Sequence, residues 1–148
     1  MEKLLLLPVS KPDRNKLEEA YEVAEDAASA FGGAAVKVPK FFQYDGASIP
    51  APMWQLIGTP FQPRFMLAAV FHDWIFHTHQ LKFGDANEMF YELLIASGVG
   101  ATRASLMYAA VEGAGKAYWN NDEDDRDYLK RLAARITKDR RDPAEYGL

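Results

Sequence analysis

The stretch Phe71–Gln80, FHDWIFHTHQ, decides how the rest of the chain is interpreted, because it contains all three histidines, His72, His77 and His79. On a helix running from about residue 64 to 78, apolar residues around His72 recur at steps of three and four. His72 therefore lies in the middle of an apolar stripe, whereas His77 points well away from it. A polar group in such a place is costly without a hydrogen-bond partner, so we expect a carboxylate or carbonyl oxygen against His72.

The histidine spacing disfavours a three-histidine metal site. A zinc-binding pair on one helix requires two histidines four residues apart, whereas the gaps here are five, two and seven residues. The chain has no cysteine, which excludes disulfides and thiolate zinc sites. His77 and His79 are expected instead at the C-terminal end of the helix, where a cationic side chain is favourable to the helix dipole.

The bulk properties predict one domain over residues 1–148. The chain is 49% hydrophobic and carries a net charge of −4, which disfavours a general role in binding nucleic acid. The leucine run near the N-terminus is too short for a signal peptide, and no segment reaches the length of a membrane span. These observations favour a cytoplasmic protein.

Before the histidine helix, the sequence predicts a small β element and a loop. The segment KLLLLPV has the pattern of a short buried strand, and residues 34–44 have that of a second strand limited by Pro39. Between them, apolar residues at helical spacing predict a helix from about 17 to 31, ended by Gly32 and Gly33. Residues 45–63 contain four prolines and predict an ordered, irregular loop that packs over other elements.

Three further helices are expected after the histidine helix. One runs from about Asp85, its predicted cap, to Ser97, and is stopped by Gly98. The next runs from about 102 to 118, with Gly113 and Gly115 as weak points, and the last from about 126 to 141. The predicted fold is mainly α (α+β), with a small N-terminal β element and a proline-rich loop packed on three to five helices. Residues 120–148 form a charged turn, a C-terminal helix and a tail.

Candidate partners of His72 come from the following helix. The two helices are joined by a short loop, which predicts antiparallel neighbours. Asp85 or Asn87 would then face the C-terminal half of the histidine helix, and either could orient the imidazole. Asp73 lies about 100° further round the helix than His72, so it cannot orient that ring, but it is a candidate ligand for a cation.

The segment DGASIP, residues 45–50, is the third component of the expected site. It does not have the spacing of a serine nucleophile elbow, although a Ser48–His72–aspartate triad stays open. A turn with one carboxylate and exposed backbone oxygens suits a hard cation such as calcium. The candidate binding residues are Asp45, Gly46, Ser48 and Trp74, although we favour core or loop packing as the role of the Trp74 indole.

Together these motifs resemble a known family. The pattern YDGASIP…W…G…P…AAVFHDWIF…ANEMFYELL…G, from about Val36 to Trp119, resembles the phage and prophage family known as domain of unknown function 1353. The resemblance implies a phage or prophage origin and no settled activity. It makes residues 36–119 the family-like core of the chain.

A second resemblance concerns the layout of the site. The pattern GTP…AA…HD…AN..F is similar to that of phospholipase A2 domains, especially the viral capsid type. This resemblance implies that His72 is the general base for ester hydrolysis and that Asp73 binds calcium together with Asp45–Gly46 or Gly58. Asn87 stands where those domains have the orienting aspartate, and Asp85 is the alternative.

Two functions follow from these patterns. The favoured one is a non-catalytic, virion- or tail-associated or host-interaction protein, in the host cytoplasm or the virion, whose buried His–Asp network fixes the fold. The alternative is a hydrolase acting on an ester of a membrane lipid or envelope component, with His72 as base, Asp85 or Asn87 as orienting residue and calcium at Asp73. An open cleft at His72 would favour the hydrolase, and a sealed core would favour the network.

Overall fold

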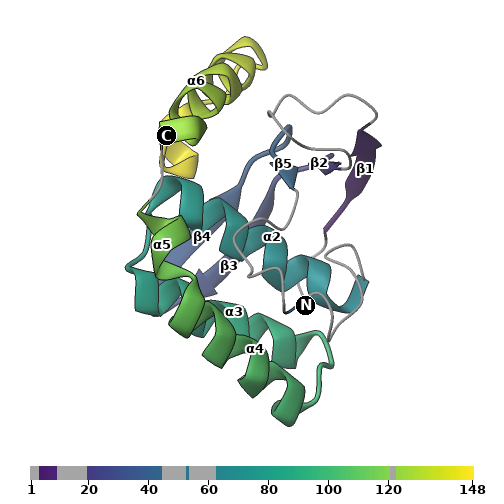
Figure 1. The fold of residues 1–148 in the computed structure, drawn as a ribbon. Helices are drawn as coiled ribbons and strands as arrows, with labels where there is room; N and C mark the ends of the chain where they lie inside the picture. Colours follow the sequence, from purple (N-terminus) through teal and green to yellow (C-terminus); the bar gives the residue numbers. More distant parts are fainter. Residues whose placement is uncertain (1–3, 10–19, 45–52, 54–62, 121–122) are drawn as a thin grey trace. The chain divides into compact units, whose positions relative to one another are not determined.

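The computed structural model describes residues 4–9, 20–44, 53, 63–120 and 123–148, drawn in colour in Figure 1. Two compact units are distinguished by their internal contacts. The helical unit is Gly46–Asn121, and the sheet unit combines Glu2–Asp45 with Asp122–Leu148. Long helices and short antiparallel strands confirm the predicted mainly α, α+β class. The proline-rich loop lies largely outside the described residues, and the prediction of one domain over 1–148 stays a prediction.

The helical unit consists of α2 (Pro63–Thr78), α3 (Phe83–Ala96), α4 (Ala101–Ala114) and the short α5 (Lys116–Trp119). α3 packs on both α2 and α4, and α5 contacts α2 and α4 (Figure 1). The three predicted helices are thus confirmed, with α3 starting two residues early. Capping by Asp85 is wrong, because the N-cap is Lys82 and Asp85 already lies in the first turn, where the dipole favours a carboxylate.

α2 is the most buried element of its unit. Every residue from Leu67 to His77 is buried, as is Phe65, so the apolar face is far wider than the predicted stripe. His77 was expected to point away from the core and is only 6% exposed. The reason is that α2 is apolar almost all round, which is typical of a central helix. Among the described residues, no helix is both long and apolar enough to cross a membrane.

The two glycines at the end of α4, Gly113 and Gly115, provide a matched test of the close backbone approach there. A Cβ atom added at Gly115 would lie 2.5 Å from the carbonyl oxygen of Val111, whereas one added at Gly113 would meet nothing within 4 Å. We expect Gly115→Ala to lower the free energy of unfolding by about 1–2 kcal/mol. Gly113→Ala should raise it by about 0.5–1 kcal/mol, because alanine favours a helix. Urea denaturation of both variants checks the opposite signs, and equal effects would contradict the close approach at residue 115.

The sheet unit contains a three-stranded antiparallel sheet, in the order β1-β2-β5, and a separate hairpin, β3-β4. The strands are β1 (Leu6–Val9), β2 (Ala20–Val23), β3 (Ala27–Phe31), β4 (Ala34–Val38) and β5 (Gln43–Tyr44). The predicted strands near the N-terminus and within 34–44 are confirmed.

The predicted helix from 17 to 31 is wrong in its described part, because residues 20–23 and 27–31 are strands. Gly32 and Gly33 both have positive φ, 58° and 83°, and form the two-residue turn of a hairpin rather than a helix stop. The hairpin pairs Ala27 with Val38 and Ser29 with Val36, and both valines are buried. Tertiary pairing with buried valines therefore overrides the helical spacing of small residues.

The C-terminal segment completes the sheet unit through α6 (Glu123–Lys138) and the 3-10 helix η1 (Pro143–Tyr146). The predicted last helix is confirmed, and its buried side chains, Tyr128, Leu132 and Ile136, recur at helical spacing. The backbone N–H of Gln43 donates to the Tyr128 hydroxyl at 2.8 Å, which ties β5 to α6.

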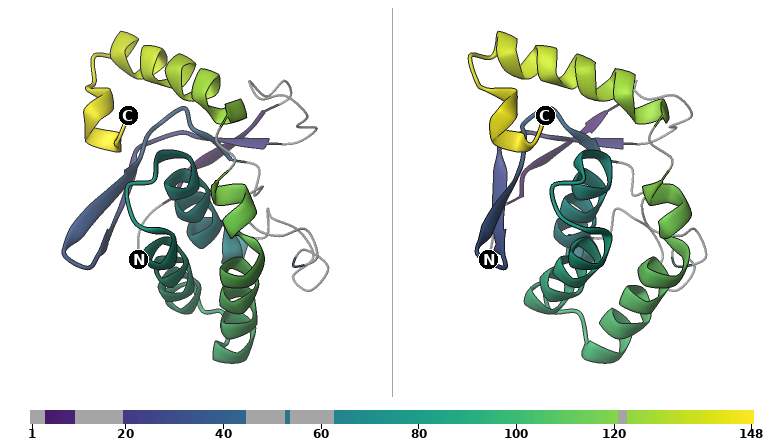
Figure 2. Two further views of the ribbon diagram at one scale, coloured as in Figure 1. Left: turned by 60° about the vertical axis from the view of Figure 1, so that its left-hand side comes forward. Right: turned by 90° about the vertical axis from the view of Figure 1, so that its left-hand side faces the viewer.

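Figure 2 shows the chain turning back between α6 and η1. In η1 the buried Tyr146 donates its hydroxyl proton to Asp26 at 2.5 Å, and Asp26 also pairs with Arg141. Burial and the Asp26 carboxylate raise the pKa of Tyr146 to about 12. The predicted tail is therefore an ordered part of the sheet unit.

Candidate functional site

His72 and Asn87 form the centre of the candidate site. His72 lies on α2 and is 1% exposed, and Asn87 lies near the start of α3 and is fully buried. His72 Nε2 and Asn87 Oδ1 are 2.7 Å apart. The expected partner from the second helix is therefore present, and it is Asn87. The packing of α2 on α3 brings the two side chains together.

Glu112 on α4 determines how the pair is oriented. Asn87 Nδ2 donates to Glu112 Oε1 at 3.3 Å. An ionised carboxylate only accepts hydrogen bonds, so the amide must present its NH₂ group to Glu112 and its oxygen to His72. His72 Nε2 must then carry the proton that it donates to Asn87, which leaves Nδ1 as the basic nitrogen of the neutral ring. Three helices are joined by this His72–Asn87–Glu112 chain.

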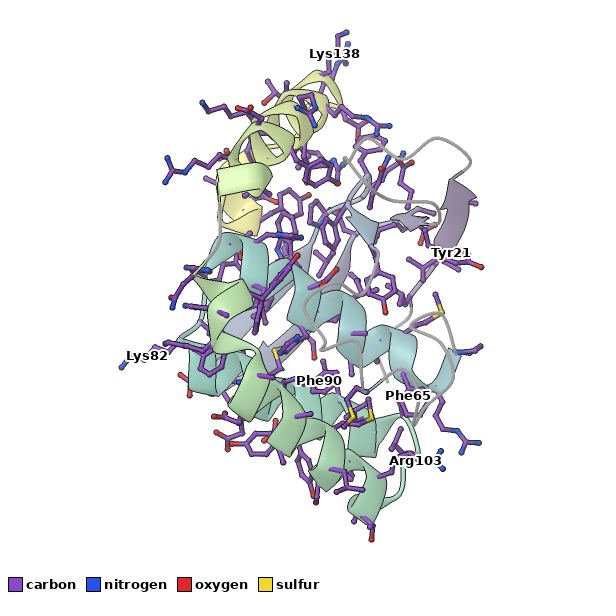
Figure 3. All side chains as sticks on the ribbon, viewed as in Figure 1. Tyr21, Phe65, Lys82, Phe90, Arg103 and Lys138 are labelled. Carbon is purple, nitrogen blue, oxygen red and sulfur yellow. The ribbon has the colours of Figure 1, made fainter. Side chains whose placement is uncertain are left out.

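The surroundings of His72 are aromatic. Its ring centroid lies 4.2 Å from that of Phe76 and 4.8 Å from that of Phe90, which is labelled on α3 in Figure 3. Burial lowers the pKa of His72 to about 4, against the opposing effects of the Asn87 hydrogen bond and the Asp73 charge. The imidazole is therefore neutral at pH 7.

Comparison with known proteins places this helical core in a family. The family model described as "Protein of unknown function (DUF1353)" matches residues 16–111, which include both His72 and Asn87. The chain belongs to the DUF1353 family. The match confirms the family that the motifs resemble. It ends at residue 111, one position before Glu112.

Two relatives from Sinorhizobium fredii share part of this chain. The uncharacterized protein y4jT is 39% identical over 74 residues, which cover 50% of this chain and 22% of the relative. The uncharacterized protein y4iH is 36% identical over 67 residues, which cover 45% of this chain and 28% of the relative. The matched segment thus spans less than a third of the length of either relative. No solved structure matches the chain.

Asp73 and Trp74 follow His72 in the DUF1353 region, and both are fully buried. Trp74 belongs to the core of the described structure, as core packing predicts, and its role in binding stays a prediction. No group of three or more His, Asp or Glu side chains among the described residues could hold a metal ion. The other predicted calcium ligands, Asp45, Gly46, Ser48 and Gly58, lie outside the described residues, so the calcium site stays a prediction.

Asp85 was the alternative partner of His72 in this DUF1353 chain. It lies half-buried in the first turn of α3. Within the described part of the chain, its carboxylate takes part in neither a hydrogen bond nor an ion pair. The structure therefore brings Asn87, two residues later, to the imidazole.

The other two histidines lie at and after the end of α2. His77 lies in the last turn of α2, as predicted, but is buried there. His79 follows the helix with a positive φ of 55° and stacks on Trp119, with ring centroids 3.8 Å apart and planes 3° apart. His79 is exposed and lies one residue beyond the predicted helix end, because α2 ends at Thr78.

Glu112 is the member of the site that sequence analysis missed. Its signal is weak: one acidic residue in the small-residue segment YAAVEGAG, 25 positions after Asn87. Only the packing of α4 on α3 shows that the two side chains meet. Burial and the Glu112 carboxylate also raise the pKa of Tyr108, one turn earlier on α4.

Proposed function

We propose that this chain is a non-catalytic protein of phage or prophage origin that acts by binding a virion, tail or host protein. The observation that carries the proposal is the burial of His72, which is 1% exposed between Phe76 and Phe90. A general base must reach a water molecule and a substrate, whereas this imidazole is enclosed by aromatic rings. The His72–Asn87–Glu112 chain then serves to fix the packing of three helices, as satisfied buried polar networks do.

The edge of the sheet unit supports an interaction role. β1 is an edge strand, and among the described strands it pairs with β2 alone. Leu5 and Leu7 lie on the same side of this segment and are 37% and 53% exposed. An edge strand with exposed leucines offers both backbone hydrogen bonds and apolar surface to a partner.

Family membership supports the proposed origin. The motifs that resemble the phage and prophage family lie within the region matched by DUF1353. A protein of this origin would act in the host cytoplasm or in the virion.

A hydrolase is the second candidate, and one specific observation favours it. Asn87 and Glu112 fix the proton on Nε2 of His72, so Nδ1 is a defined basic nitrogen. The lowered pKa keeps that nitrogen unprotonated at pH 7. A base held in one tautomer by a neighbouring side chain is the arrangement used for water activation. The substrate would be an ester of a membrane lipid or envelope component, with calcium at Asp73.

An esterase assay distinguishes the two candidates. We expect the wild-type protein to hydrolyse short-chain phosphatidylcholine and p-nitrophenyl esters no faster than His72→Gln, with or without calcium chloride. Glutamine is chosen because its amide can still donate to Asn87. His79→Gln is the matched control, since His79 is exposed and takes no part in the hydrogen bond to Asn87.

The opposite result would establish catalysis. If wild type and His79→Gln hydrolyse the ester at equal rates and His72→Gln is at least about a hundredfold slower, as loss of a general base predicts, the non-catalytic proposal is wrong. Calcium dependence of that activity would then support Asp73 as a ligand.

A further inference from the structure

A cavity of about 660 Å³ lies at the end of the helical unit where α4 begins. Its described lining comes from one residue of segment 45–63, the start of α2, and α4 with the two residues before it. These residues are Met53, Arg64, Val99, Gly100, Ala101, Thr102, Arg103, Leu106 and Met107. This volume falls within the range of about 300–1,000 Å³ of small-molecule sites. His72, Asn87 and Glu112 are not among the residues that line this cavity.

Two arginines give the cavity its charge. Arg64 from α2 and Arg103 from α4 both line it, and both also line a smaller adjoining cavity with Pro63 and Phe65. Figure 3 labels Arg103 and Phe65, which lie toward the same end of the unit. Within the described residues neither guanidinium forms an ion pair. Two guanidinium groups without an internal counter-ion fit the bidentate recognition of phosphate oxygens.

The N-terminus of α4 adds to the positive electrostatic potential of the two arginines. Gly100 is the N-cap of α4 and provides no side-chain acceptor, so the first-turn N–H groups of Ala101 to Arg103, which line the cavity, receive no side-chain cap. Neither α2 nor α4 has an acidic residue in its first turn. The positive end of the α4 dipole therefore reinforces the arginines, and the described residues that line the cavity include no carboxylate.

The remaining wall is apolar and defines the rest of the ligand. Met53, Val99 and Met107 are buried, and Leu106 is 55% exposed at the same cavity. A bare inorganic anion would leave this surface unused. We propose that the cavity binds a phosphate group carried on an apolar body, with Arg64 and Arg103 on the phosphate and Leu106 on the apolar part.

The proposed phosphate site is separate from the candidate site at His72. Arg64 precedes His72 by eight residues, which corresponds to about 12 Å along the α2 axis. The inference therefore holds or fails independently of whether the chain is catalytic.

Calorimetric titration of the full chain tests the proposal with two soluble probes, inorganic phosphate and hexyl phosphate. We expect hexyl phosphate to bind more tightly than inorganic phosphate. Arg64→Gln and Arg103→Gln should each weaken the binding of hexyl phosphate by about tenfold or more, which is the usual loss for a charge-assisted hydrogen bond. Arg140→Gln is the matched control, since Arg140 is an exposed arginine of the sheet unit without an ion pair among the described residues.

Leu106→Ala tests the apolar part of the site. This substitution should weaken the binding of hexyl phosphate and leave the binding of inorganic phosphate unchanged. Sedimentation with phosphatidylcholine vesicles, with and without phosphatidic acid, then distinguishes the sources: binding to acidic vesicles identifies a lipid head group, and binding to hexyl phosphate alone identifies a free monoester.

The proposal is overturned if neither probe nor vesicle binds, or if both arginine variants bind hexyl phosphate as tightly as Arg140→Gln does. Equal affinity for the two soluble probes, unaffected by Leu106→Ala, would reduce the site to a simple anion site and overturn the assignment of an apolar body. Since both arginines are exposed, circular dichroism should show native spectra for every variant.

Discussion

His72→Ala is expected to lower the free energy of unfolding by about 3–4 kcal/mol, which combines the cavity left by a buried ring with an unsatisfied buried amide. The ring is 1% exposed and packs between Phe76 and Phe90, so its removal leaves a space that these aromatic side chains fill only in part. Asn87 is fully buried and would lose the donor at 2.7 Å from its oxygen. Urea denaturation followed by circular dichroism measures the change.

His79→Ala is the control for this substitution, because His79 is exposed and its main contact is the stacked Trp119 ring. Its effect should stay within about 1 kcal/mol. A loss of less than about 1 kcal/mol in His72→Ala as well would show that the hydrogen-bonded chain contributes little to holding the three helices together.

Acidification should destabilise the protein through the same side chain. His72 has a pKa of about 4 in the folded protein and an ordinary value of 6.5 in the unfolded chain. Between these values the unfolded chain binds more protons, so the free energy of unfolding decreases as the pH falls. His72 contributes fully above pH 6.5, and the loss is about 1.4 kcal/mol per pH unit, or about 3 kcal/mol in total by pH 4.

Carboxylates also titrate in the lower part of this window, so the prediction is a difference between two proteins. Urea denaturation at several pH values should show that wild type loses more stability than His72→Gln between pH 6.5 and 4, because glutamine takes up no proton. Parallel stability profiles for the two proteins would mean that His72 is accessible to protons in the folded state and would count against the sealed core.

Most of the helical unit could be predicted from the sequence. The histidine helix, α3 and the break at Gly115 follow from apolar spacing, prolines and glycines, which are local signals. The pairing of His72 with the start of α3 also followed, because the loop between the helices is short. The choice of Asn87 over Asp85 required the actual register of two packed helices.

The sheet unit was less accessible to prediction. Residues 20–31 have alanine-rich spacing that favours a helix, yet residues 20–23 pair with β1 and β5, and residues 27–31 pair with the strand that holds Val36 and Val38. The contacts of Glu112 and Tyr146 were missed for a related reason. Glu112 bonds to Asn87, 25 residues away in the sequence, and Tyr146 bonds to Asp26, 120 residues away. Local patterns carry no information about such distant contacts.

The order of the two units along the chain has a consequence for synthesis. The sheet unit consists of Glu2–Asp45 and Asp122–Leu148, with the whole helical unit between them, and the hydrogen bond from Gln43 to Tyr128 joins its two segments. A ribosome therefore releases all of α2 to α5 before α6 emerges. Chains fold in units as they emerge, so the helical unit can acquire its core while the early strands still lack their C-terminal partners. During that interval the strands of the first segment, which carry the exposed Leu5 and Leu7, are open to pairing with other chains.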